Sequence, residues 1–238
     1  MDRVFPDNPA DCGVVVAARP LDISYLKPAF EPPGPSSRRH GLVISEVMYH
    51  PPARADGRNL EFIEIYNSQP WFEEVGGWRI SGAVDYTFPS NTVLAAGSYR
   101  IIAANPADFS AAYPNAAGVL GPFTGGGSLP NDSGTLRLRN ARDAILFEMQ
   151  YRDEPPWPAA ADGAGHSLVL ARPSYGERDP RAWDASDLMG GTPGTNDVQT
   201  TFAQRSLVIN EILAHTDPPA VDYIELFNYS SSSSVNLN

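Results

Sequence analysis

Two short stretches of this chain occur twice, in the same order. Residues 42–46 (LVISE) recur as residues 207–211 (LVINE), and residues 61–67 (EFIEIYN) recur as residues 222–228 (DYIELFN). Self-similarity of this kind indicates a repeated structural unit, and the alternation of apolar and polar residues makes each stretch a strand. Two strands cannot bury a core by themselves. We therefore expect one complete module, followed by the first two strands of a truncated second copy. Either a longer protein was cut here, or these two strands lean on the first module.

Alternation with a period of two also dominates the region between the two copies. Close spacing of short strands, with turn residues between them, predicts an all-β sandwich. Asn105-Pro106 provides an N-cap and a first-turn proline, so one short helix is expected over residues 106–112. The predicted strands are residues 42–49, 60–67, 78–81, 86–88, 98–104, 135–139, 145–151 and, as the last of the module, 166–170.

These patterns divide the chain into three parts. Residues 1–40 are rich in proline and are predicted to be a linker or the tail of a preceding module. Residues 41–198 form the predicted sandwich domain, which ends at the glycine-rich stretch 190–196. Residues 199–238 are predicted to be a linker and the opening strands of the second copy. In the first module, Trp78, Ile80, Leu136, Leu138 and Phe147 alternate with polar neighbours and should face the core.

Composition limits the classes of partner. The formal net charge is −11, from 28 acidic and 17 basic residues, which disfavours nucleic acids and anionic lipids as partners. No run of 18 apolar residues predicts a membrane span. Cys12 is the only cysteine, so neither an internal disulfide nor a cysteine-based zinc site can form. The first thirty residues do not resemble a signal peptide, so either the protein is not exported or this chain begins inside a longer one.

Four polar residues near the first two strands are candidates for chemistry: Glu46, His50, Glu61 and Glu64. Carboxylates and an imidazole could bind calcium or a transition metal, and two carboxylates could form an acid pair of the glycosidase type. Their spacing matches no metal-binding motif, and we favour strand-edge or half-buried groups bonded to backbone or arginine. We predict no catalytic, metal-binding or cofactor-binding residues and no cofactor, and keep Glu46, His50 and Glu64 as possible ligand contacts.

Tryptophans offer a different hypothesis. Trp78, Trp157 and Trp183 could form a platform for sugar rings, although tryptophan more often packs in the core. Trp157 is the best candidate for an exposed ring, because the prolines at 155, 156 and 158 prevent it from joining a strand ladder. It is therefore added to the possible ligand contacts.

Residues 42 to about 196 resemble the bacterial branch of the lamin tail domain family. The resemblance runs through LVISEVMYHPP, EFIEIYN, GWRISGAVDYTFP, SYRIIAANPADFSAAYP, VLGPF and GHSLVL, and ends at GTPGTN. It implies an immunoglobulin-like β-sandwich, found in large modular proteins that are secreted or surface-associated. The sequence departs from the usual form of the family at residues 70–75 (PWFEEV).

We therefore expect a non-catalytic binding or structural module of a large, extracellular or surface-associated, modular bacterial protein. Its expected partners are a protein or cell-surface ligand and the neighbouring domains of the same parent chain. The alternative is a carbohydrate-binding accessory module attached to an enzyme elsewhere in that parent chain. An enzyme is the least favoured reading.

Overall fold

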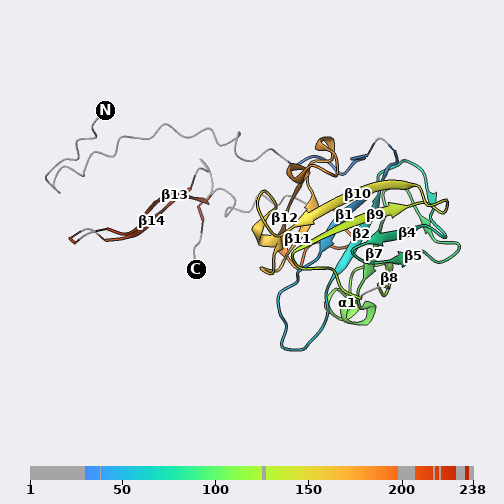
Figure 1. Cartoon of the computed structure of the whole chain (residues 1–238), viewed down its shortest axis with the longest axis horizontal. Helices are drawn as coiled ribbons and strands as arrows, with labels where there is room; N and C mark the ends of the chain where they lie inside the picture. Colours follow the sequence, from blue (N-terminus) through green and yellow to red (C-terminus); the bar gives the residue numbers. More distant parts are fainter. Residues whose placement is uncertain are drawn as a thin grey trace. The chain divides into compact units, whose positions relative to one another are not determined.

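The structure is a computed structural model that describes residues 30–37, 39–124, 127–197, 207–216, 218–219, 221–228 and 234–235. Two units are distinguished, a sandwich within Phe30–Thr200 and a strand pair within Thr201–Asn238 (Figure 1), and each is described by itself. Most of the predicted N-terminal linker, Cys12 and residues 198–206 lie outside the described residues. Within the described part of the chain, no helix is long and apolar enough to cross a bilayer.

The sandwich consists of two antiparallel-rich sheets and one small ribbon. A six-stranded sheet has the order β12-β11-β1-β2-β7-β8, a four-stranded sheet has the order β10-β9-β4-β5, and β3 pairs with β6. Between the strands lie helix α1 and three 3₁₀ turns. The elements are β1 (Leu42–Met48), β2 (Phe62–Asn67), β3 (Glu73–Glu74), β4 (Arg79–Gly82), β5 (Tyr86–Thr87), β6 (Val93–Leu94), β7 (Tyr99–Ala103), α1 (Pro106–Ala112), β8 (Val119–Leu120), β9 (Ser133–Arg139), β10 (Ile145–Arg152), η3 (Ala159–Ala161), β11 (His166–Leu170), η4 (Pro173–Tyr175), η5 (Pro180–Ala182) and β12 (Trp183–Met189).

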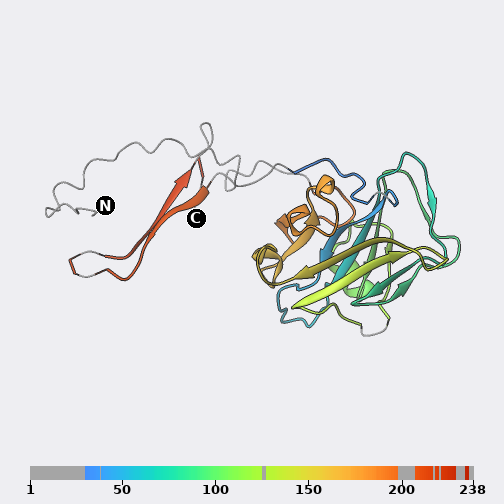
Figure 2. The same ribbon diagram turned by 45° about the horizontal axis from the view of Figure 1, so that its top comes forward.

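The core lies between the two sheets. Figures 1 and 2 show β9 and β10, in yellow-green, lying over β1 and β2. Alternate residues of both sheets meet there, as a sandwich requires. All five residues predicted to face the core are buried, which confirms that prediction: Trp78, Ile80, Leu136, Leu138 and Phe147.

The predicted all-β fold with one short helix is confirmed. Helix α1 begins and ends as predicted, with the Asn105 side chain accepting hydrogen bonds from the backbone N–H groups of Ala107 and Asp108. The prediction that residues 166–170 form the last strand of the module is wrong, because β12 follows and pairs with β11. β12 carries three polar residues, Asp184, Ser186 and Asp187, at the edge of the sheet, so its sequence lacks the apolar alternation that would reveal it.

The six-stranded sheet also buries part of its outer face. Phe109 of α1 is fully buried there and meets Phe62 of β2 edge-on, with ring centroids 5.4 Å apart. Met48, Ile101 and Ala103 complete the buried part of this second, smaller apolar cluster. Helix α1 therefore covers one end of the outer face, and the rest of that face contains the candidate site.

Residues 30–37 pack on the sandwich, although the sequence suggested a linker there. The backbone N–H of Glu31 donates to the carbonyl of Ala171 at 2.7 Å, and its carboxylate accepts from the N–H of Ser174 at 2.8 Å. Ser37 Oγ donates to the carbonyl of Leu146 at 3.1 Å. We call this segment the strap; it ties β10 to the turn that follows β11.

The second unit is an antiparallel pair of β13 (Leu207–Leu213) and β14 (Tyr223–Asn228). The predicted pairing of these strands is confirmed. The pair reproduces the register of β1 and β2 and shifts at the same point, between Ile209 and Glu211 as between Ile44 and Glu46.

Candidate functional site: a buried pair of carboxyl groups

Glu46 and Glu64 lie directly opposite each other on β1 and β2. They are 2% and 1% exposed, far more buried than the half-buried groups that the sequence suggested. A β-bulge at Ser45 shifts the register just before Glu46. A bulge re-aims the side chains that follow it, and here it brings both carboxyl groups together on the outer face of the sheet.

Hydroxyl and backbone donors surround the pair. Glu46 accepts hydrogen bonds from Ser167 Oγ and from the N–H of Thr192, the latter at 3.0 Å. Glu64 accepts from Ser45 Oγ at 2.7 Å and from the N–H of Gly194 at 2.5 Å. The bonds to backbone N–H groups agree with the favoured prediction. The other bonds described here come from serine hydroxyls and not from arginine.

The stretch Gly190–Asp197, which we call the closing loop, is held over the pair by these bonds. Gly191 adopts a left-handed backbone conformation with φ of 77°, and a Cβ atom there would collide with Oε1 of Glu46. At the start of the loop, the hydroxyl of Tyr113 donates to the carbonyl of Gly190 at 2.8 Å. The glycines therefore let the backbone approach the carboxyl groups closely.

Burial dominates the electrostatics of the pair. It raises the pKa of Glu64 to about 8. It also raises the pKa of Glu46 well above its ordinary value, and the neighbouring Glu64 adds to this effect. Two carboxyl groups this close and this deep cannot both ionise without a large penalty. The pair therefore holds a proton at neutral pH and stabilises the closing loop mainly by hydrogen bonding.

A cavity of about 40 Å³ adjoins the pair, between the strap and the closing loop. Its walls include Tyr66 and Tyr99, whose rings lie 4.6 Å apart between centroids. This volume admits water molecules and is far below the several hundred Å³ of a typical small-molecule site. The arrangement is therefore suited to fastening the loop and not to enclosing a substrate.

The other two members of the predicted group point elsewhere, so the four residues do not form one cluster. Glu61 accepts from Ser128 Oγ and from the N–H of Leu129, both at 2.6 Å, and burial raises its pKa. The Nδ1 atom of His50 lies 2.6 Å from Oδ1 of Asp162, at the surface. Across the described residues no group of three or more His, Cys, Asp or Glu side chains is placed to hold a metal ion.

The predicted exposure of Trp157 is wrong. Its side chain is buried, 8% exposed, and its ring lies 6.5 Å from that of Trp183 between centroids. The prolines keep residue 157 out of the sheets but do not keep it out of the core. A buried ring offers no face to a sugar, so Trp157 no longer supports the carbohydrate alternative. Trp78 and Trp183 are buried too, as core packing predicted.

Two aromatic residues elsewhere in the sandwich are more than half exposed. Trp71 and Phe72 are 58% and 61% exposed, on the connection between β2 and β3. Neither is among the predicted ligand contacts. The signal was nevertheless present, since both belong to the stretch 70–75 that departs from the usual form of the resembled family.

The chain is similar to a known protein family. No curated protein matches the chain. The family described as Lamin Tail Domain matches residues 35–153, half of the chain, from the strap to the end of β10. The matched residues include β1, β2, both members of the carboxyl pair and all of α1. The chain therefore belongs to the lamin tail domain family, whose members are immunoglobulin-like structural domains.

Proposed function

We propose that the chain is a non-catalytic binding and structural module of a large, secreted or surface-associated, modular bacterial protein. It would mediate interaction with another protein or with a cell surface. The observation that carries this proposal is the strand pair β13–β14, which has the register and the bulge of β1–β2. Repetition of one hairpin supports a parent protein built from successive modules of this kind, in which weak contacts gain strength through avidity.

The carboxyl pair supports a structural role and not a catalytic one. Each group accepts one hydrogen bond from the closing loop and one from a strand serine, and the adjoining cavity admits only water-sized molecules. A general acid or base must reach the proton that it transfers. Glu46 and Glu64 are at most 2% exposed, so no substrate reaches them in this structure.

Cell binding tests the proposal. The fluorescently labelled full chain would be added in increasing amounts to intact cells of the bacterium that encodes it, before and after the cells are treated with trypsin. We expect saturable binding that trypsin abolishes. Binding that survives trypsin and is displaced by free oligosaccharides would favour the carbohydrate-binding alternative, and no saturable binding at all would contradict both.

A further inference from the structure

Two adjacent aromatic residues face solvent on the connection that follows β2. Trp71 and Phe72 are more than half exposed, and Val93, on the neighbouring strand β6, is 39% exposed. Glu74 lies directly opposite Val93 in the β3–β6 ribbon and is exposed as well. We call these four residues the aromatic–acidic patch.

A buried amide holds the backbone of this patch in place. Asn67, the last residue of β2, is fully buried. Its Nδ2 donates to the carbonyl of Trp71 at 2.9 Å and to the carbonyls of Leu94 and Ala95 at 3.1 Å. The same side chain thus ties the aromatic connection to the end of β6. A surface fixed before binding loses less conformational entropy when a partner arrives.

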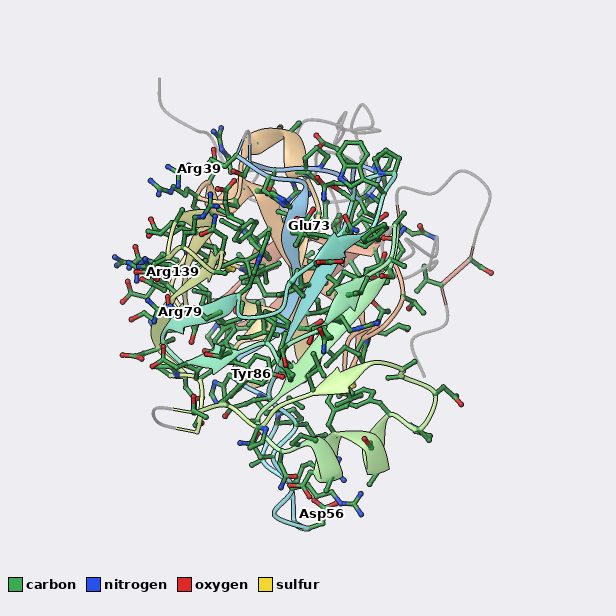
Figure 3. All side chains as sticks on the ribbon, turned by 90° about the vertical axis from the view of Figure 1, so that its right-hand side faces the viewer. Arg39, Asp56, Glu73, Arg79, Tyr86 and Arg139 are labelled. Atoms are coloured by element: carbon green, nitrogen blue, oxygen red, sulfur yellow. The ribbon has the colours of Figure 1, made fainter. Side chains whose placement is uncertain are left out.

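The acidic residues near the patch and the negative net charge of the chain indicate the charge of the partner. Two glutamates follow the aromatic residues in the chain: the carboxylate of Glu73 lies 3.6 Å from His40 Nε2 and accepts from Gln69 Nε2 at 3.1 Å, and Glu74 is exposed. In Figure 3, Glu73 lies toward the opposite end of the sandwich from Asp56. Arg79 and Arg139 lie along another side, and Arg39 lies toward the same end as Glu73. The nearby Arg100 donates to the carbonyls of Val93 and Tyr99. With a net charge of −11 as well, the chain favours a cationic partner.

The chain itself shows how arginine fits a surface of this composition. The guanidinium of Arg181 lies 5.4 Å from the ring centroid of Tyr175 and 2.6 Å from the carboxylate of Asp179. Among the described residues, no arginine or lysine lies over the ring of Trp71 or Phe72. The aromatic–acidic patch has the same two components, a ring and a carboxylate, without the cation.

We propose that the aromatic–acidic patch binds an arginine-bearing segment of a partner polypeptide, with a guanidinium stacked on Trp71 or Phe72 and paired with Glu74. Cation–π contact is strongest on tryptophan, and arginine is the cation that most often makes it. This inference rests on the proposed function, because it names the chemistry of the partner that the module would bind.

Intrinsic fluorescence gives a selective readout. The chain has four tryptophans, and the other three, Trp78, Trp157 and Trp183, are at most 8% exposed. Quenching by acrylamide therefore reports mainly on Trp71. The full chain would be titrated with a twelve-residue peptide of alternating arginine and glycine, and with the same peptide carrying citrulline, the neutral counterpart of arginine. We expect saturable protection of Trp71 from acrylamide by the arginine peptide only.

Calorimetry with variants identifies the surface. Trp71→Ala should weaken binding of the arginine peptide by about tenfold. Glu74→Gln should weaken it by about three- to fivefold. The matched controls are Tyr175→Ala, another exposed aromatic residue, and Glu154→Gln, another exposed acid, which should leave the affinity unchanged. All four positions are exposed, and unchanged melting temperatures would show that the variants fold.

Several results would overturn the inference. An equal loss of affinity for the arginine peptide in Glu74→Gln and Glu154→Gln would show that the peptide is attracted to the acidic protein as a whole and not to the patch. Trp71-dependent binding of cellohexaose or of phosphatidylcholine vesicles, without binding of the arginine peptide, would assign the patch to a sugar or a lipid. If Trp71→Ala leaves trypsin-sensitive cell binding intact, the inference fails while the proposed function stands. If cell binding is absent from the wild-type chain, the proposed function fails.

Discussion

The strand pairs β1–β2 and β13–β14 share their register and their bulge, and they differ in what covers them. Ile44 and Ile63 of the first pair are fully buried, whereas their counterparts Ile209 and Ile224 are 59% and 63% exposed. The bulge residue also behaves alike, since Ser45 donates to Glu64 and Asn210 donates to Glu225. Local sequence is therefore enough to specify the hairpin, while burial is supplied by the strands and loops around it.

The largest difference is expected from one substitution made in both pairs. Ile63→Ala should lower the free energy of unfolding of the sandwich by about 2–5 kcal/mol, because it leaves a cavity at a fully buried site. Ile224→Ala removes the same atoms from an exposed position and should change the free energy of unfolding of the sandwich by less than about 0.5 kcal/mol. Urea denaturation of the two variants measures both values. Equal losses would show that β14 is packed as tightly as β2.

The carboxyl groups give a difference that depends on pH. Because burial raises the pKa of Glu64 to about 8, its stabilising contribution is complete below its ordinary pKa and is lost as the pH rises through about 8. The free energy of unfolding should therefore fall between about pH 5 and pH 8. In the Glu64→Gln variant the free energy of unfolding should depend less on pH, and at pH 8 it should exceed that of the wild type by about 1–3 kcal/mol.

Glu225→Gln is the matched control for that experiment, because Glu225 occupies the same register position on an exposed strand. It should leave the pH dependence of urea denaturation unchanged. A wild-type protein that gains stability from pH 5 to pH 8 would show that both buried carboxyl groups are ionised in the folded state.

A smaller effect is expected at the bulge. Ser45→Ala removes a donor to the buried Glu64 and should reduce the free energy of unfolding by about 1–2 kcal/mol. Asn210→Ala removes the corresponding donor to an exposed carboxylate, where water replaces it, and should have little effect. Thermal denaturation followed by circular dichroism compares the two. A larger loss in Asn210→Ala would reverse the assignment of which pair is buried.

The smallest effect on stability is expected from removing the second pair altogether. Deletion of residues 200–238 should leave the urea midpoint of the sandwich unchanged, since β13 and β14 form a sheet of their own. Light scattering should show equal or less self-association, because the deletion removes exposed apolar residues such as Ile209 and Ile224. Unfolding of the sandwich on deletion would show that the repeated strands belong to it.

Much of the fold could be predicted because apolar and polar residues alternate clearly along its strands. On β2, Phe62 and Glu64 face outward and Ile63 and Ile65 face the core, as the period of two predicted. β3, β6 and β8 have two residues each, too short to show a period. The burial of Trp157 could not be predicted from the residues around it. Its neighbouring prolines show only that the backbone there cannot join a strand ladder, whereas the ring packs near Trp183, which is distant in sequence.

Only part of the candidate site could be predicted. Neighbouring strands place Glu46 and Glu64 side by side, so their proximity follows from local sequence. The closing loop follows them by more than a hundred residues, and no local pattern connects Thr192 to Glu46. Glu61, which precedes β2, is close to Glu64 in sequence, but its carboxylate bonds to Ser128 and Leu129 instead of joining the pair.

The strap determines how the sandwich would respond to mechanical tension. A pulling force that enters the chain ahead of Phe30 meets the bonds of Glu31 to Ala171 and Ser174 before it reaches β1. Further along, the bond from Ser37 to Leu146 takes up load on the other sheet. These bonds precede β1 in the chain, so the strap can peel away and dissipate load while the ladder between β1 and β2 stays intact.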